Sequence, residues 1–310
     1  MFDKTGLRKS ALAVRQLRHA VLLLLFGLGI ATARAEISVT DDAGHRIVLS
    51  RPAQRIISLA PHVTELVFAA GAGEKLVGVV EYSDYPETAK RLPHIGSHAA
   101  FDLERIAALR PDLAIAWGSG NPPSQLAQLR RLKIPVFVSE PKQLDDIPAT
   151  LRNIGRLAGT SGETAARAFE TRLENLRQRY AERASVSVFY EIWNQPLMTI
   201  GGTHIISDAL QVCGGRNVFA TLRQPAASVD LEAVLRMNPE AIIASGMDAA
   251  RPEWLDHWRR WPQLAAVKRG NLFFVPPELL QRHTPRLLDG VEQVCAALET
   301  ARERENQRGK

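Results

Sequence analysis

The sequence predicts an α/β protein with two similar lobes, and three observations carry this prediction. Short apolar segments typical of buried strands alternate with amphipathic segments along most of the chain, which indicates parallel sheets covered by helices on both faces. A segment of 17 residues occurs twice, once in each half. A stretch of strong helix formers lies between the halves. We therefore expect lobes over 36–152 and 185–303, one long rigid connecting helix over 153–184, and a frayed tail over 304–310.

The first lobe opens with a predicted hairpin over 37–49, whose two short strands flank the turn Asp41-Asp-Ala-Gly44. Strands and helices then alternate, and Gly71 and Pro111 mark the ends of the first two helices. The predicted strands cover 55–59, 76–80, 113–116 and 136–138, and the predicted helices cover 64–70, 103–109 and 124–132.

A long helical stretch over 147–183 follows, interrupted near Gly159 and Gly162. Its second half, from Glu163 to Arg183, contains no glycine or proline, so we expect a stiff connector and not a flexible linker. The alternation of strands and helices then resumes. The second lobe has predicted strands over 186–190, 241–244 and 272–275, and predicted helices over 205–213, 231–237, 254–261 and 286–302.

One internal repeat organises the chain. The segment Asp102–Gly118 recurs 128 residues later as Asp230–Gly246, with identical residues at seven of the 17 aligned positions and no gap. Each copy has the pattern of a helix, a turn with proline and a strand. Unrelated helix–strand units can converge on such a pattern, but two related lobes explain the repeat and the alternation together. A cleft between two lobes is a preferred place for a ligand.

The first 35 residues have the pattern of a secretory signal peptide. A basic segment ends near Arg18, an apolar run covers Val21–Ile30, and Ala33-Arg-Ala35 has the small residues of a cleavage site. A membrane anchor is the alternative, but the run is shorter than the ~20 residues that span a bilayer. We expect a soluble periplasmic protein of a Gram-negative cell whose mature chain begins at Glu36.

The same segment holds most of the net charge. The formal charge of the chain is +6, and residues 1–35 contribute +5 of it. The remainder is nearly neutral, with 33 basic and 32 acidic residues. Because nucleic-acid binding requires a basic face on the folded part, the composition gives it no support.

The chain has two cysteines, Cys213 and Cys295. Their spacing of 82 residues fits no zinc or redox motif. An even number of cysteines in an oxidising compartment suggests one disulfide, and two buried free thiols are the alternative.

The sequence lacks the common motifs of catalysis. It has no Gly-x-Ser-x-Gly elbow and no His-Glu-x-x-His helix. The segment Gly71-Ala-Gly-Glu-Lys75 follows a predicted helix, whereas a phosphate-binding loop follows a strand. We therefore expect a protein that is not an enzyme, with no catalytic residues and no cofactor.

Histidines are the candidate metal ligands. Five lie in loops near predicted strand ends, where ligands of parallel sheets bind, but no pair has the tight spacing of a zinc motif. They either converge on a metal in the folded protein or are single polar loop residues, and we expect the second. These histidines are His62, His94, His98, His204 and His283.

Aromatic residues give a clearer signal. Tyr82 and Tyr85 follow one predicted strand, Trp117 ends another, and Trp193 follows a third. All four are expected at the carboxyl edges of strands, facing the cleft between the lobes. Exposed rings there suit a large, flat, partly apolar ligand, and packing in the core is the alternative.

Several segments match the pattern of a known family. They are Arg55-Ile-Ile-Ser-Leu-Ala-Pro-His-Val-Thr-Glu-Leu66, Tyr82-Ser-Asp-Tyr-Pro86, Leu103-Glu-Arg-Ile-Ala-Ala-Leu-Arg-Pro-Asp-Leu-Ala-Ile-Ala-Trp117, Val212-Cys-Gly-Gly-Arg-Asn-Val-Phe219 and Thr284-Pro-Arg286. With them the chain resembles the periplasmic substrate-binding proteins of ABC importers for iron-siderophores, haem and vitamin B12, and above all their cobalamin branch. The resemblance covers nearly all of residues 53–300. It implies the class III fold of this family, in which one long rigid helix joins two Rossmann-like α/β lobes with limited hinge motion.

The resemblance implies roles for residues at matching positions. Tyr82 and Trp117 fall where the rings of the family contact the corrin. Cys213 and Cys295 fall on the disulfide of the family.

The two copies of the repeat carry a second implied role. Glu104 and Glu232 occupy the same position of the two copies, and they fall on the docking glutamates that meet arginines of the permease.

Other family positions hold different residue types here. A corrin-facing tryptophan is replaced by His98, a second cleft tryptophan by Ala226, and two phenylalanines by Ile192 and Met198. The aspartate of the last cleft loop is replaced by Glu278. Of these residues, we expect His98, Met198 and Glu278 to contact the ligand.

Three further expectations concern the ligand site. We expect Trp193 to compensate for the lost rings and Arg282 to contact the ligand. A neutral imidazole at His98 could coordinate cobalt when an axial position is free, and a hydrogen bond to a corrin amide or to water is the alternative. We expect no metal site of the protein's own.

These expectations define a non-enzymatic protein. It would capture cobalamin or a related corrinoid in the periplasm and deliver it, as a monomer, to the permease and ATPase complex of an ABC importer. Haem or an iron-siderophore is the alternative ligand within the same class. A hydrolase or metal-dependent enzyme is the rival from another class, and it would need a catalytic constellation that the sequence lacks.

Overall fold

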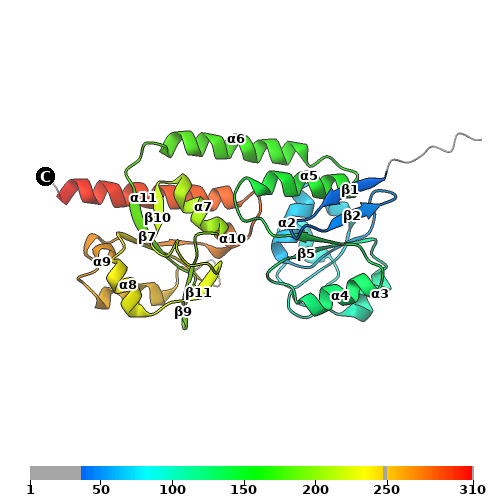
Figure 1. The fold of residues 1–310 in the computed structure, drawn as a ribbon, viewed down its shortest axis with the longest axis horizontal. Coiled ribbons are helices and arrows are strands. Elements are labelled where there is room, and N and C mark those ends of the chain that lie inside the picture. The colour runs from blue at the N-terminus through cyan, green and yellow to red at the C-terminus, as the bar shows by residue number, and fades with distance from the viewer. Residues whose placement is uncertain (1–35, 247–249, 309–310) are drawn as a thin grey trace, which may run out of the picture. The chain divides into compact units, whose positions relative to one another are not determined.

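The computed structural model describes residues 36–246 and 250–308. It shows an α/β fold with two lobes, each built on a parallel four-stranded sheet (Figure 1). The predicted signal peptide over 1–35 lies outside the described residues. Within the described ranges, no helix has the length and apolar character to cross a membrane.

The sheet of the first lobe has the strand order β4-β3-β5-β6. All its pairs are parallel, and the strands are β3 (Ile56–Ser58), β4 (Leu76–Val79), β5 (Leu113–Trp117) and β6 (Val136–Ser139). The helices are α2 (Pro61–Ala69), α3 (Leu103–Leu109), α4 (Pro123–Arg131) and α5 (Asp146–Ala158), with 3-10 turns η1 (Gly73–Lys75) and η2 (Glu87–Arg91).

Helices cover both faces of this sheet, as predicted. Ile56 and Ile115 belong to the core cluster that includes α2 and α5, whereas Ile57 and Ala114 belong to the cluster on the side of α3 and α4 (Figure 1). The predicted hairpin is also confirmed, because β1 (Ile37–Thr40) and β2 (Arg46–Leu49) pair antiparallel.

The sheet of the second lobe has the order β10-β7-β12-β13 and is also parallel. Its strands are β7 (Val186–Glu191), β10 (Gly215–Asn217), β12 (Ala241–Ser245) and β13 (Leu272–Val275). Its helices are α7 (Ile205–Val212), α8 (Leu231–Met237), α9 (Ala265–Arg269), α10 (Pro277–Leu280) and α11 (Leu287–Arg308), with the 3-10 helix η3 (Glu253–Arg260).

The two copies of the sequence repeat adopt the same local structure. Arg110 directly follows α3 and Asn238 directly follows α8, and both of these residues have a left-handed backbone with φ of 47° and 43°. A proline follows each of them, and then a central strand of the sheet, β5 or β12. The repeat therefore places equivalent residues at equivalent positions of the two lobes.

The connector differs in detail from a single helix over 153–184. Gly159 and Gly162 have φ of 72° and 61°, and the chain turns between α5 and the 18-residue helix α6 (Glu163–Tyr180). A Cβ at Gly162 would lie 2.2 Å from the carbonyl oxygen of Leu151, so the turn requires glycine there. α6 packs against α5 and also against α7 and α11 of the second lobe (Figure 1).

Several segments of the second lobe depart from the sequence prediction, among them the strand β10 and the short helices α9 and α10, which were not predicted. A three-stranded antiparallel sheet was not predicted, and it has the order β11 (Ala226–Ser228), β9 (Leu197–Ile200), β8 (Trp193–Asn194). The segment predicted as a helix over 254–261 forms the 3-10 helix η3. α11 continues to Arg308, beyond its predicted end at Arg302 and through most of the segment expected as a frayed tail.

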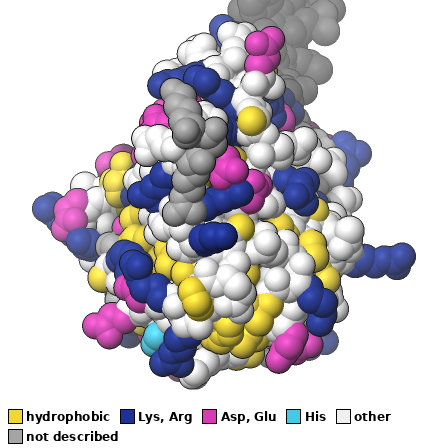
Figure 2. Space-filling view, turned by 90° about the vertical axis from the view of Figure 1, so that its left-hand side faces the viewer, with side chains coloured by type: hydrophobic (Ala, Val, Ile, Leu, Met, Phe, Trp, Pro, Cys, Tyr) yellow, Lys and Arg dark blue, Asp and Glu magenta, His cyan; other side chains and the backbone are white. Residues whose placement is uncertain are grey.

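Charges are mixed on the face of the second lobe that Figure 2 shows. Lys and Arg side chains lie scattered among Asp and Glu side chains, with apolar patches between them. The described residues on this face form no continuous basic stripe of the kind that nucleic-acid binding uses.

Candidate functional site

Tyr82 is a highly exposed member of the predicted ligand residues. It lies in the turn that follows β4, its relative accessibility is 74%, and its backbone has φ of 64°. A bulky side chain rarely occurs on a backbone in the left-handed region. This conformation costs of order 1–3 kcal/mol. The turn thus holds an aromatic ring in solvent on a strained backbone.

Trp117 ends β5 in the same lobe, at the carboxyl edge of the sheet. Its ring contacts the rings of His62 and His98, with centroids 5.3 and 5.9 Å apart. A Cβ at Gly120 would come within 1.8 Å of the Trp117 ring, so the indole packs directly on the backbone. The side chain of Asn121 donates a hydrogen bond to the carbonyl of His98 and holds this loop beside Trp117.

A row of histidines continues from Trp117 towards the second lobe. The ring of His283 lies 5.8 Å from that of His62 and 5.7 Å from that of His204. Burial and the charge of Arg282 lower the pKa of His62 to about 3, and burial lowers the pKa of His204 to about 4. Burial and its two histidine neighbours also hold the pKa of His283 well below its ordinary value. All three imidazoles are therefore neutral near pH 7.

Several polar atoms in this row are buried without a partner. They are Nε2 of His62, Nδ1 of His283 and Nε1 of Trp117, none of which has a hydrogen-bond partner among the described residues. No group of three His, Cys, Asp or Glu residues in the described part of the chain has an arrangement that could hold a metal ion. The partial convergence of the histidines is thus explained by ring packing.

The remaining predicted ligand residues belong to the second lobe. Trp193 and Met198 are cross-strand partners on β8 and β9, and both are half-buried. The indole of Trp193 donates a hydrogen bond to the carbonyl of Gln195, which fixes the ring over the hairpin. Glu278 lies half-buried in the first turn of α10.

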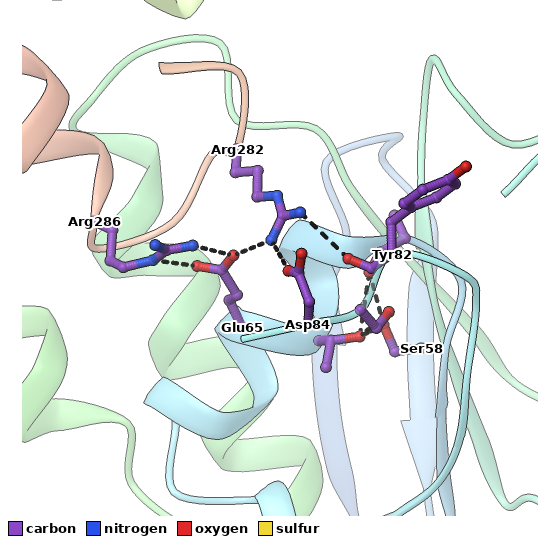
Figure 3. A network of polar contacts seen from close by, with 9 residues as sticks. Ser58, Glu65, Tyr82, Asp84, Arg282 and Arg286 are labelled. Atoms are coloured by element: carbon purple, nitrogen blue, oxygen red, sulfur yellow. Dashed lines mark hydrogen bonds and ion pairs between the residues drawn. The ribbon is translucent and has the colours of Figure 1, made fainter. Parts of the chain in front are cut away.

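Arg282 belongs to a network of charges between the lobes (Figure 3). Its Nη1 donates to Glu65 Oε1 at 2.9 Å and to Asp84 Oδ1 at 2.5 Å. Its Nη2 donates to the carbonyl of Tyr82 at 3.3 Å. Arg286 makes two hydrogen bonds with the carboxylate of Glu65, at 2.7 and 3.0 Å, and its guanidinium lies 3.8 Å from the centroid of the Tyr85 ring.

Sequence reasoning did not find this network, although one signal was present. Glu65 is the only charged residue within α2, and its side chain is 2% exposed. A buried carboxylate inside an apolar helix requires cationic partners, because its desolvation is costly. Burial raises the pKa of Asp84, but the hydrogen bond and charge of Arg282 outweigh burial and bring that pKa below its ordinary value.

The two repeat glutamates occupy equivalent surface sites. Glu104 and Glu232 lie in the first turns of α3 and α8, and both are exposed. Within the described part of the chain, no ion pair or hydrogen bond of either carboxylate is present. Asp102 caps α3 by accepting from the backbone N–H of Arg105, whereas Asp230 forms no such side-chain cap on α8.

The cysteines form the expected disulfide. Cys213 directly follows α7 and Cys295 lies in α11, so the bond joins the last helix to the second lobe. The alternative of two free thiols is excluded in this structure.

Several known proteins are similar to this chain in sequence. The family described as periplasmic binding protein matches residues 56–279. A vitamin B12-binding protein of Vibrio cholerae serotype O1 is 41% identical over 253 residues, which are 81% of this chain and 91% of the relative. A vitamin B12-binding protein of Yersinia pestis is 38% identical over 248 residues, which are 79% of this chain and 86% of the relative.

Solved structures agree with this similarity. The periplasmic vitamin B12-binding protein BtuF of Vibrio cholerae has a TM-score of 0.75 and 40% identity, over 81% of this chain and 98% of that one. A periplasmic haem-binding protein of Pseudomonas aeruginosa has a TM-score of 0.70 and 25% identity, over 79% of this chain and 92% of that one.

Proposed function

Because the chain belongs to the periplasmic binding protein family, we propose that it captures cobalamin or a related corrinoid and delivers it to an ABC importer. One observation in the structure supports this most: the ring of Tyr82 is 74% exposed on a turn that is held in a strained conformation. Strain of this kind persists at sites where function requires it. A fixed, exposed aromatic ring suits the flat and partly apolar face of a corrin.

The proposed ligand contacts come from both lobes. Tyr82, Trp117 and His98 supply one wall, and Trp193 and Met198 supply the other. Glu278 would accept hydrogen bonds from ligand amides. The protein is proposed to act without catalysis and without a cofactor of its own, since the corrinoid is its cargo.

A titration of the mature protein with cyanocobalamin, haemin and a ferric siderophore, followed by tryptophan fluorescence, tests this function. Ring contacts contribute about 1 kcal/mol beyond the burial of area, so Trp117→Ala should weaken cyanocobalamin binding about tenfold or more. The matched control is Trp261→Ala, because Trp261 packs on Trp258 in the second lobe. Saturable binding of haemin or the siderophore with no binding of cyanocobalamin would overturn the corrinoid assignment.

Contact of His98 with the ligand is the second part of this proposal, either by a hydrogen bond or by coordination of the ligand metal. The imidazole lies against Trp117, which places a nitrogen ligand beside the proposed ring wall. Aquocobalamin has an exchangeable axial position, so coordination would shift its visible spectrum on binding to the wild type and not to His98→Ala. Identical spectra would leave His98 with a hydrogen-bonding role.

Docking to the permease and ATPase complex is proposed to use Glu104 and Glu232. Each carboxylate is exposed and without a partner among the described residues, and the repeat gives each lobe one of them. Charge pairs of this kind set register and association rate more than affinity. Arginines of the permease would meet one carboxylate per lobe.

Substitution of these two glutamates tests the docking surface. Glu104→Ala and Glu232→Ala should each lower corrinoid uptake, and the double variant should lose most of it, with ligand affinity unchanged. Matched controls are Glu74→Ala and Glu253→Ala, since both residues are exposed in the first turn of a 3-10 helix, one in each lobe. Full uptake by the double variant in a strain without the native protein would refute this role.

A further inference from the structure

The turn that presents Tyr82 is held from two sides. From its own lobe, Thr64 Oγ1 donates to Ser83 Oγ at 3.0 Å, and the backbone N–H of Asp84 donates to the carbonyl of Tyr82 at 3.0 Å. From the other lobe, Arg282 donates to the same carbonyl and to the carboxylate of Asp84. The guanidinium of Arg282 is therefore hydrogen-bonded to both the first and the third residue of Tyr82-Ser-Asp84, as Figure 3 shows.

The guanidinium of Arg282 is itself fixed. Nη1 also donates to Glu65, whose buried carboxylate is held a second time by Arg286. The positive charges of these two arginines thus balance the negative charges of the Glu65 and Asp84 carboxylates. Hydrogen bonds between charged groups are about twice as strong as neutral ones, and they lose little to solvent where the carboxylate is buried.

The backbone at Tyr82 needs this support. Its φ of 64° is unfavourable for a residue with a Cβ, and such strain persists only where the surroundings determine the conformation. The ring of Tyr82 points away from the network, while its carbonyl points into the network (Figure 3). A hydrogen bond from Arg282 to the carbonyl of Tyr82 thus orients the Tyr82 ring, although Arg282 does not contact that ring.

We propose that Arg282 is a positioning residue, which sets the orientation of the Tyr82 ring across the boundary between the lobes and does not act as a ligand contact. Both of its Nη atoms are engaged by acceptors of the protein, in agreement with this role. The inference rests on the proposed function in one respect, namely that Tyr82 contacts the ligand. It makes the affinity for ligand dependent on a contact between the lobes.

A double-mutant cycle with cyanocobalamin distinguishes positioning from direct contact. If Arg282 acts through Tyr82, Arg282→Gln weakens binding about three- to tenfold in the wild type and less than about twofold in the Tyr82→Ala background. If the guanidinium contacts the ligand itself, the two losses multiply in the double variant. Multiplying losses would overturn the proposal.

Hydrogen exchange of the ligand-free protein gives a readout that does not depend on the ligand. Arg282→Gln should speed the exchange of the Asp84 amide, since this N–H donates to the carbonyl that Arg282 holds, while β7 keeps its protection and reports that the chain is folded. Unchanged exchange at Asp84 would overturn the proposal.

The matched control is Arg286→Gln, because Arg286 shares the Glu65 carboxylate but donates no hydrogen bond to Tyr82 or Asp84 within the described structure. It should speed exchange at Asp84 less than Arg282→Gln does, and equal effects would overturn the proposal. If the wild type fails to bind cyanocobalamin, the corrinoid function fails, and the exchange experiment still decides whether Arg282 fixes the turn.

Discussion

Glu191 gives the sharpest test of the electrostatics of this fold. It is the last residue of β7, and its relative accessibility is 2%. Burial raises the pKa of Glu191 from 4.5 to about 8, although a hydrogen bond of 2.7 Å from the indole of Trp258 opposes the shift. The folded protein therefore keeps the proton of Glu191 at pH 7, while the unfolded chain releases it above about pH 4.5.

The sign of the pH dependence follows from proton linkage. Between pH 4.5 and pH 8 the folded state binds more protons at this site than the unfolded state, so rising pH favours unfolding. One pKa unit corresponds to about 1.4 kcal/mol, which gives a loss of about 2–3 kcal/mol between pH 5 and pH 7. The loss reaches about 4 kcal/mol by pH 9, once the folded carboxyl ionises.

Glu191→Gln isolates this contribution, because the amide cannot ionise and can still accept the hydrogen bond from Trp258. Urea unfolding at pH 5, 7 and 9 gives the free energy of unfolding of each protein, and other titrating groups cancel in the difference between them. The variant should gain stability relative to the wild type as pH rises. A difference that stays constant from pH 5 to pH 9 would refute the reasoning.

Glu240→Gln is a control of opposite sign. Burial of Glu240 is outweighed by hydrogen bonds from Ser187 and Arg269, which bring the pKa of Glu240 below 4.5. The ionised carboxylate therefore stabilises the fold above pH 4.5, and this stability is lost as pH falls through the folded pKa. Relative to the wild type, Glu240→Gln should gain stability only in acid.

Three further predictions concern stability. The pKa of His283 lies well below 6.5, so the folded state should weaken as pH falls below 6.5, and His283→Gln should reduce this acid dependence of the urea midpoint. Loss of the bond between Cys213 and Cys295, which closes a loop of 82 residues, should cost about 4–5 kcal/mol on the chain-entropy model, and an unchanged melting temperature after reduction would contradict this. Gly162→Ala should destabilise by more than about 1 kcal/mol, because its Cβ would meet a carbonyl oxygen of α5, whereas Gly44→Ala, with the same sign of φ and open space, should cost less in the same urea titration.

The α/β alternation was predictable because the central strands are buried on both faces. The first four residues of β5 are fully buried, and such strands are short apolar runs between polar segments. The small sheet of β8, β9 and β11 was missed because its strands have two to four residues, too few to show a period. The end of α11 was missed because its charged residues resemble a solvated tail, yet Arg304 donates to the carbonyl of Gly270 and Arg269 pairs with Glu305.

The candidate site also has a part that the sequence could predict and a part that it could not. Tyr82 and Trp117 could be predicted as ligand contacts because a strand edge and a ring can be recognised within a few residues of sequence. The Glu65–Arg282 contact joins residues that are 217 positions apart, and no local pattern pairs them. The sequence predicted Arg282 as a ligand contact, and only the geometry shows that its guanidinium donates to Glu65, Asp84 and Tyr82.

Two separate sets of contacts brace the lobes against each other. Near α6, Arg177 pairs with Asp145 before α5, and Arg172 pairs with Asp289 and Glu292 of α11. One apolar core cluster also continues through α5, α6 and α11. Near the Tyr82 turn, the second brace is the buried carboxylate of Glu65 with its two arginines.

A hinge motion that bends the molecule at α6 would have to break the contacts of Glu65 with Arg282 and Arg286. Separating a buried carboxylate from its arginine partners costs about 3–5 kcal/mol, so the ligand-free protein should stay in one arrangement of its lobes. Spin labels at Ala108→Cys and Arg236→Cys, equivalent exposed positions of α3 and α8, measure the spacing of the two helices that carry Glu104 and Glu232. We expect the same distance with and without cyanocobalamin, and a broader distance distribution in Glu65→Gln. A ligand-dependent change of more than about 2 Å in the wild type would show that the braces do not hold the lobes.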